Sequence, residues 1–246
     1  MKKISVILPT YNEAGNIVQL IKAINQQIKK LKLAPEIIVI DDNSQDGTAD
    51  EVLKLIKKLP VKLFKRKKRG LATAIHLGIK KSSGEIIILM DTDFNHKPKD
   101  VSRLLKPILK NKADLVIGSR YIKDGGMHRS EAGTIQFLGS KYGSLFVSKI
   151  LLNLPVKESL SGFLAFKKLI LNNLNQKAIF QGYGEYCIRL LYRTMKNNYK
   201  LTEIPVIYGK RRYGQSKSRL FRMMIDYFFA AMKLRINDII PSGNAI

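Results

Sequence analysis

The chain has 246 residues, 45% of them hydrophobic, so it can bury a substantial core, and disorder over most of its length is excluded. Its 44 basic and 19 acidic residues give a net charge of +25, which indicates an anionic partner: nucleic acid, an anionic membrane surface or a phosphorylated substrate. The single cysteine, Cys187, excludes an internal disulfide and fits a reducing compartment.

Continuous apolar runs in the first half predict strands that are covered on both faces. They are Ile4–Pro9, Glu36–Asp41, Glu85–Asp91 and Ala113–Ser119, with a short basic strand expected around Val61–Lys65. Segments of helical periodicity lie between them, at Ile17–Leu31, Thr48–Lys58, Leu71–Lys81 and Lys99–Asn111. This alternation predicts an α/β fold with a doubly wound, mostly parallel sheet, whose strands end at a shared ligand-binding edge.

The second half is less regular. Helices are expected at Gly133–Asn153 and Gly182–Asn198, and strands at Ser161–Phe166 and within Lys200–Gly209. Leu220–Ile240 is apolar but interrupted by charges, which predicts an amphipathic helix that lies in a headgroup layer or packs on the domain or a partner. We expect one domain over residues 1–217, followed by a membrane- or partner-associating helix and tail over residues 218–246. No apolar stretch reaches the roughly 18 residues that span a bilayer.

Two aspartates end the third apolar run, in the stretch ILMDTDFNHKP. Asp91 and Asp93 point the same way if the chain stays extended across Thr92. Neighbouring carboxylates repel unless a cation lies between them, and hard oxygen ligands suit Mg²⁺ or Mn²⁺, with Asn95 or His96 completing the set. On this motif alone, a solvated turn in which Asp91 caps the next helix is the alternative.

Polar groups also follow the other strands. After the second, Asp41 and Asp42 are not explained by helix capping and suit hydrogen bonds to a nucleobase or ribose. After the first, Tyr11 and Glu13 are candidate nucleotide contacts, although Asn12 also suits a helix cap. The basic run Lys65–Arg69 is either a solvated face or a phosphate contact beside Gly70.

The combination is more specific than its parts. VILPTYNEAGNI, VIDDNSQDGT, GLATAIHLGI, ILMDTDFNHKP and VIGSRY, in this order and spacing, resemble the GT-A glycosyltransferases of family 2. SLSGFLAFKK and EIPVIYGKRRYGQSKSR also resemble dolichyl-phosphate mannosyltransferases and related polyprenyl-phosphate glycosyltransferases. The resemblance covers roughly residues 3 to 220 and implies a Rossmann-like GT-A fold.

The resemblance implies roles for the matching residues. Those expected to hold a nucleotide sugar are Pro9, Tyr11, Glu13, Asp41, Asp42 and Lys68, together with Asp91 and Asp93. The metal positions are Asp91, Asp93 and Asn95. Positions expected to bind an acceptor phosphate are Arg120, Arg129, Arg211 and Lys217, and Arg211 joins the two aspartates as a catalytic residue.

The implied reaction is transfer of mannose from GDP-mannose, with Mg²⁺ or Mn²⁺, to dolichyl or polyprenyl phosphate. UDP-glucose or UDP-GlcNAc is the alternative donor, and another acceptor remains open. The resemblance also implies an enzyme that lies peripherally on the cytoplasmic face of a membrane, with or without a separate anchoring subunit. Two readings from other classes remain: a basic nucleic-acid-binding protein, which the acidic strand ends disfavour, and an inactive membrane-complex subunit, which the intact D-x-D disfavours.

Two departures from the family pattern stand out. Glu158 lies near a position where relatives commonly carry Asp, and Arg189 lies where they commonly carry Glu, with Glu185 one turn earlier. No role is transferred to the helix that contains Arg189.

Overall fold

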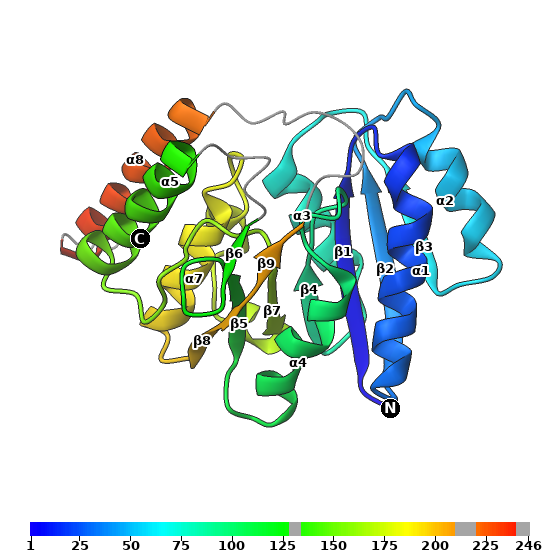
Figure 1. The fold of residues 1–246 in the computed structure, drawn as a ribbon, viewed down its shortest axis with the longest axis horizontal. Helices are drawn as coiled ribbons and strands as arrows, with labels where there is room; N and C mark the ends of the chain where they lie inside the picture. The colour runs from blue at the N-terminus through cyan, green and yellow to red at the C-terminus, as the bar shows by residue number, and fades with distance from the viewer. Residues whose placement is uncertain (128–133, 210–219, 240–246) are drawn as a thin grey trace, which may run out of the picture.

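The computed structural model describes residues 1–127, 134–209 and 220–239, and a seven-stranded sheet lies at the centre of this part of the chain (Figure 1). Its spatial order is β3 (Val61–Lys65), β2 (Ala34–Asp41), β1 (Lys3–Thr10), β4 (Ile86–Leu89), β7 (Leu164–Lys167), β5 (Leu115–Ser119) and β8 (Leu201–Pro205). All neighbours pair in parallel except β7, which is antiparallel to β4 and β5. The predicted doubly wound, mostly parallel sheet is confirmed.

Helices cover both faces of the sheet. One face carries α1 (Ala14–Lys30), α2 (Thr48–Ile56) and α4 (Val101–Leu109), with the short η1 (Pro98–Asp100) before α4. The other carries α3 (Leu71–Lys81), α6 (Gln176–Ile179) and α7 (Tyr186–Lys196), with η3 (Lys168–Leu171) after β7. Successive strand residues point to opposite faces, so Leu8 joins the first core and Ile7 the second, which is why the strands are apolar without interruption.

The remaining elements lie toward the carboxyl-terminal half. They are β6 (Gly126–Met127), which pairs in parallel with β9 (Ile207–Tyr208), then α5 (Thr134–Leu145), the π-helix η2 (Phe146–Leu151) that continues α5, and α8 (Leu220–Ile239). In Figure 1, α5 and α8 lie side by side at the edge of the molecule far from α2. No helix in the described ranges combines the length and apolarity needed to cross a bilayer.

Most predicted elements of the first half are confirmed, and the differences lie at the ends. The prediction places α1 from Ile17, whereas the helix begins at Ala14 because the Glu13 carbonyl already accepts the backbone N–H groups of Asn16 and Ile17. The third predicted strand runs to Asp91, whereas β4 ends at Leu89 and the chain bends at Thr92. The D-x-D motif therefore lies in a loop just beyond the strand.

The strand order places a crevice at the carboxyl end of β1. Strands β2 and β4 flank β1 on its two sides, so the connections leave β1 and return to the sheet in opposite directions. In open α/β sheets, this reversal of strand order is where ligands bind. The loops after β1, β2 and β4, which carry the polar motifs, meet at this point.

Candidate active site

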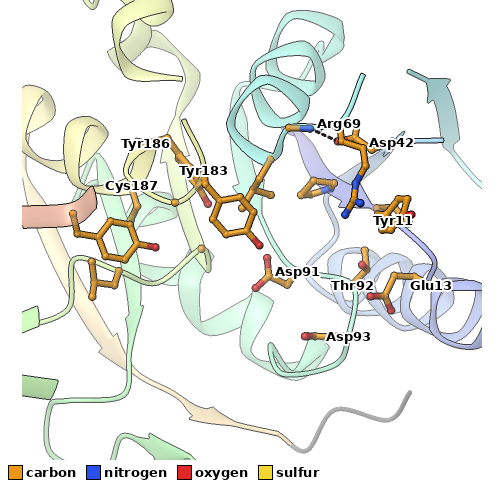
Figure 2. A pocket seen from close by; sticks show the side chains of 18 residues that line it. Tyr11, Glu13, Asp42, Arg69, Asp91, Thr92, Asp93, Tyr183, Tyr186 and Cys187 are labelled. Atoms are coloured by element: carbon orange, nitrogen blue, oxygen red, sulfur yellow. Dashed lines mark hydrogen bonds between the residues drawn. The ribbon is translucent and has the colours of Figure 1, made fainter. Parts of the chain in front are cut away.

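A cavity of about 560 Å³ opens where these loops meet (Figure 2). Its lining comes from the end of β1 and the following loop, the loop after β2, the start of α3, the D-x-D loop, the segment before β7, the loop before α7 with the start of that helix, and α8. The residues are Pro9, Thr10, Tyr11, Glu13, Asp42, Arg69, Gly70, Leu71, Asp91, Thr92, Asp93, Leu160, Gly162, Tyr183, Gly184, Tyr186, Cys187 and Tyr227. We call it the donor cavity. Six of the eight positions predicted to bind a nucleotide sugar line it: Pro9, Tyr11, Glu13, Asp42, Asp91 and Asp93.

One end of the donor cavity combines an aromatic ring, a cation and a buried carboxylate. The Arg69 guanidinium lies 3.5 Å from the centre of the Tyr11 ring, a cation–π contact. The Asp42 carboxylate accepts the Gly70 N–H at 2.8 Å and lies 3.3 Å from Arg66. Burial raises the pKa of Asp42, against the opposing effects of the Gly70 N–H and the Arg66 guanidinium. This end offers stacking, charge and acceptor groups to a planar, polar ligand.

Two predicted nucleotide residues lie elsewhere. Asp41 is fully buried beneath the loop, where its carboxylate accepts the backbone N–H and the hydroxyl of Ser44. Lys68 is exposed, and its carbonyl accepts a hydrogen bond from Arg66. The cation that lines the donor cavity is Arg69, the neighbour in the same basic run of the predicted Lys68. Asp41 instead shapes the loop that presents Asp42.

The D-x-D motif lies in the middle of the donor cavity. The Asp91 side chain is 46% exposed, whereas Asp93 is buried. Asn95 contacts Asp93 twice, with its backbone N–H 3.0 Å from Oδ1 and its side-chain Nδ2 2.9 Å from Oδ2. Phe94 has a φ of +67°, in the left-handed region, which turns the chain sharply after Asp93. Asn95 thus supports Asp93 from outside the set of residues that line the cavity.

His96 fixes the backbone of the first aspartate of the motif, Asp91. Its Nδ1 accepts the Asp91 backbone N–H at 3.0 Å, and its ring stacks on Phe163 with centroids 4.7 Å apart. Burial lowers the pKa of His96 to about 4, so the imidazole is neutral at pH 7. Since Nδ1 is an acceptor, the hydrogen of this neutral ring lies on Nε2, 3.7 Å from the Asp91 carboxylate. His96 fixes the backbone from which Asp91 projects.

A second cavity of about 450 Å³ adjoins the first. It lies between α5, η2 and α8. We call it the apolar cavity, because apolar side chains such as Phe146, Val147 and Phe228 line it. Its lining residues are Asp91, Arg120, Gly139, Ser140, Gly143, Phe146, Val147, Leu160, Gly162, Tyr208, Met224, Tyr227 and Phe228. Four of them, Asp91, Leu160, Gly162 and Tyr227, also line the donor cavity, so the two spaces meet at Asp91.

Arg120, a predicted phosphate ligand, forms a cationic group in this apolar cavity. The backbone N–H of Arg120 donates to Glu158 Oε2 at 2.6 Å, and its guanidinium Nε and Nη2 both donate to Oε1. The guanidinium also lies over the rings of Tyr121 and Tyr208, at 4.8 and 4.5 Å from their centres. Glu158 is completely buried, so Arg120 is held rigidly by the residue that departs from the family's Asp.

The other three predicted phosphate ligands, Arg129, Arg211 and Lys217, lie outside the described residues. The chain does approach the D-x-D loop just before residue 210. The Gly209 N–H donates to the Asn95 carbonyl at 2.9 Å, and a Cβ on Gly209 would lie 2.7 Å from the carbonyl oxygen of Phe94. Glycine permits this close approach of two backbones.

The described residues contain no cluster of three or more Asp, Glu, His or Cys side chains that forms a metal site on its own. Two carboxylates are nevertheless the kind of set that Mg²⁺ and Mn²⁺ use when a bound phosphate supplies the other ligands. The donor set around Asp91 and Asp93 therefore fits a metal–nucleotide complex.

The family model described as "Glycosyl transferase family 2" matches residues 5–166. The chain belongs to glycosyltransferase family 2. The matched range contains the D-x-D motif, the donor-cavity loops of the first half, and Arg120 with its partner Glu158. It ends before the loop that carries Tyr183 and before α8.

Two named relatives align with most of the chain. The dolichol-phosphate mannosyltransferase of Pyrococcus furiosus is 36% identical over 219 residues, 87% of this chain and 59% of the relative. The polyprenol monophosphomannose synthase of Mycolicibacterium smegmatis is 30% identical over 219 residues, 86% of this chain and 79% of the relative. The chain thus spans about three fifths of the first relative and four fifths of the second.

Solved structures share the fold. Glucosyl-3-phosphoglycerate synthase of Mycobacterium tuberculosis, in complex with phosphoglyceric acid, aligns with a TM-score of 0.71 at 21% identity, over 95% of this chain and 80% of that one. Mannosyl-3-phosphoglycerate synthase of Rubrobacter xylanophilus aligns with a TM-score of 0.66 at 16% identity, over 100% of this chain and 77% of that one. At these identities the likeness shows the GT-A fold alone.

Several lining residues were not predicted as site residues. Tyr183, Tyr186 and Tyr227 form the end of the donor cavity away from Tyr11 (Figure 2 labels the first two), and Phe146 and Met224 line the apolar cavity. Helical periodicity marks the segments that carry several of them, but it does not tell which helix face meets a cavity. The sequence signal near Tyr183 is the preceding glycine, Gly182. In the structure Gly182 has a φ of +75°, a left-handed conformation that glycine adopts readily in a tight loop.

Proposed function

We propose that this protein transfers mannose from a nucleotide sugar to the phosphate of a polyprenol. The observation that carries the proposal is the meeting of two unlike cavities at Asp91, one with carboxylates and a stacked arginine, the other apolar with one fixed arginine. A sugar nucleotide is polar throughout, whereas a polyprenyl phosphate is a single anionic group on an apolar chain. The names of the two relatives, a mannosyltransferase and a phosphomannose synthase, support the choice of mannose.

The donor lies with its nucleoside between Tyr11, Arg69 and Asp42 and its diphosphate near Asp91 and Asp93. GDP-mannose is the proposed donor. Asp91 and Asp93, with Asn95 supporting Asp93, would hold Mg²⁺ or Mn²⁺, which neutralises charge that develops on the leaving diphosphate. The glucosyl-3-phosphoglycerate synthase neighbour was solved with Mn²⁺ and UDP, which supports a divalent metal and keeps a UDP-sugar as the competing donor.

The acceptor provides its own nucleophile. A phosphate monoester has a second pKa near 6, so its oxygen is mostly dianionic at pH 7 and needs no general base. Attack on the anomeric carbon, opposite the leaving diphosphate, forms the new carbon–oxygen bond as the bond to the diphosphate breaks, with inversion. Arg120 would position the acceptor phosphate beside Asp91, and Arg129, Arg211 and Lys217 are proposed as further phosphate ligands. Arg211 is the one we propose to act in catalysis.

The exposed side of α5, η2 and α8 suits a membrane surface. Its large exposed apolar side chains, here called the apolar face, are Leu138, Tyr142, Phe146, Ile150, Met224, Ile225, Phe228, Phe229 and Ile236. Phe146, Met224 and Phe228 also line the apolar cavity, so a lipid tail passes from this face toward Arg120 without crossing water.

Exposed cations accompany the apolar face. Lys149, Lys233 and Arg235 lie on η2 and α8, and a cation near an anionic leaflet contributes about 1 kcal/mol of binding. We propose that the protein lies peripherally on the cytoplasmic leaflet, where a nucleotide sugar and a reduced cysteine are expected. Binding to protein-free vesicles distinguishes direct membrane contact from a requirement for a separate anchoring subunit.

The test is transfer of radiolabelled sugar from GDP-mannose, UDP-glucose and UDP-GlcNAc to a short-chain polyprenyl phosphate, with Mn²⁺ or with EDTA. The proposal expects a lipid-linked mannose from GDP-mannose that requires the metal. A lipid-linked product from a UDP-sugar alone would correct the donor but keep the acceptor. Failure of all three donors, with no nucleotide binding in calorimetry, would overturn the proposal.

A further inference from the structure

Beyond the family motifs, we propose that Tyr183 contacts the transferred sugar and that Glu185 and Arg189 hold it in position. This inference rests on the proposed function, because it assigns the sugar subsite of the same donor cavity. It also gives a role to the Glu185–Arg189 segment, which departs from the family pattern.

The position of Tyr183 along the donor cavity suits the sugar. Figure 2 shows Tyr11 and Arg69 at one end of the cavity, Asp91 in the middle, and Tyr183 reaching toward Asp91 from the other side. In a nucleotide sugar the diphosphate separates the nucleoside from the sugar. With the nucleoside at Tyr11 and the diphosphate at Asp91, the sugar lies on the Tyr183 side, beside the junction with the apolar cavity.

Tyr183 lies on the wall of the donor cavity. Its side chain lines the cavity while the residue keeps 45% of its surface exposed, whereas the neighbouring Tyr186 is almost fully buried. A phenol offers a flat apolar face to the C–H groups of a pyranose and a hydroxyl to its oxygens, which are the two contacts that orient a sugar. Tyr186 is committed to the core, so Tyr183 is the member of this pair that meets the ligand.

A carboxylate fixes the loop beneath Tyr183. Glu185 accepts the Tyr183 backbone N–H at 2.7 Å, and a Cβ on Gly182 would lie 2.6 Å from Glu185 Oε1. The Glu185 side chain is 12% exposed and the Arg189 side chain 17%. Glu185 therefore holds the backbone of Tyr183 from below.

Arg189 completes this support. Its Nη1 donates to the Gln181 carbonyl at 2.8 Å, and its Nη2 lies 4.0 Å from Glu185 Oε1. The side chain thus ties the start of the loop to the carboxylate at its end. Glu185 and Arg189 are positioning residues, since they act on the sugar through Tyr183.

The decisive experiment compares two ligands that differ only by the sugar. Calorimetry with Mn²⁺ measures the affinity of the full chain for GDP-mannose and for GDP, in wild type, Tyr183→Phe and Tyr183→Ala. We expect Tyr183→Ala to weaken GDP-mannose binding about tenfold and GDP binding less than twofold, with Tyr183→Phe between, because about one hydrogen bond and one stacking contact are lost. Leu53→Ala, a truncation of a 51% exposed residue on α2, is the control and leaves both affinities unchanged.

The positioning residues give a second readout. Glu185→Ala should show the same selective loss for GDP-mannose, and Glu185→Gln should recover most of it because the amide oxygen still accepts the Tyr183 N–H. Equal losses for GDP and GDP-mannose in these variants would overturn the sugar contact, as would no loss in Tyr183→Ala. If wild type binds neither ligand, the proposed function fails first, whereas a wild type that binds both and ignores Tyr183 removes this inference alone.

Discussion

The two ends of the central sheet hold carboxylates in opposite situations. At the amino end Glu36 is 2% exposed, and its oxygens accept hydrogen bonds from Ser5 Oγ, Lys62 Nζ and both the backbone N–H and hydroxyl of Ser83. At the carboxyl end Asp91 has a side chain that is 46% exposed on the wall of two cavities. The comparison teaches that a buried carboxylate whose oxygens already accept several hydrogen bonds is structural, whereas an exposed carboxylate on a cavity wall is a candidate for function.

The largest effect should come from Asp91. Asp91→Asn should lower the initial rate of sugar transfer about a thousandfold, because the metal that stabilises the leaving diphosphate loses a charged ligand. The urea midpoint should stay unchanged, since the side chain is half exposed and the amide keeps its volume. A variant that retains more than a tenth of the wild-type rate would contradict the assignment of Asp91.

Glu158 combines the two situations, because it is buried and accepts hydrogen bonds from Arg120, and Arg120 lines the apolar cavity at the carboxyl end of the sheet. Glu158→Ala should destabilise the protein by about 3 kcal/mol in urea unfolding, since Arg120 would remain buried with its charge unpaired. Glu158→Asp, which keeps the charge, is the matched control and should retain most of the stability. A loss below about 1 kcal/mol for the alanine variant would show that Arg120 does not depend on this partner.

Glu36 should show the reverse of Asp91. Glu36→Gln should destabilise by about 2 kcal/mol, since the amide places a donor where every partner is a donor, while the transfer rate per folded molecule stays at the wild-type value. Equal losses of rate and stability would break the distinction between the two ends.

The same variant should change how the free energy of unfolding falls at acidic pH. Burial alone would raise the pKa of Glu36, but the hydrogen bonds from Lys62, Ser5 and Ser83 outweigh it and hold the pKa well below its ordinary value of 4.5. Its stabilisation is therefore fully present above about pH 4.5 and is lost as the pH falls below that value. Urea unfolding between pH 5 and pH 3 should show a shallower decline for Glu36→Gln than for wild type.

The smallest effect should come from the apolar face. Phe229, which is 64% exposed on α8, should contribute to vesicle binding, and Phe229→Ser should weaken binding to anionic vesicles about tenfold without changing the urea midpoint. Leu53→Ser on α2, at the far edge of the molecule in Figure 1, should bind like wild type. Equal loss in both variants would show that charge alone drives the binding.

The first half of the fold was predictable because its strands are buried on both faces and its motifs follow the strand ends. Tyr11, Glu13, Asp42, Asp91 and Asp93 line one cavity for this reason, since residues after parallel strands share one edge. Asp41 and Lys68 do not line that cavity. Adjacent residues in a loop point in different directions, and backbone geometry decides which one meets a cavity.

The second half was less predictable. The Arg120–Glu158 pair joins residues far apart in sequence, and Tyr227 reaches the junction of the cavities only because α8 packs on α7 with Ala231 and Leu234 buried. Periodicity predicts such a helix, but its docking depends on which faces are complementary in three dimensions. The boundary at residue 217 between a catalytic domain and its helix stays a prediction.

The most direct test of the account is one assay of three proteins: wild type, Asp91→Asn and Glu36→Gln, each given GDP-mannose, short-chain polyprenyl phosphate and Mn²⁺ at a temperature where all are folded. The account predicts a lipid-linked mannose from wild type and Glu36→Gln at equal rates, and almost none from Asp91→Asn. Equal product from all three proteins, or no product from wild type, would contradict it.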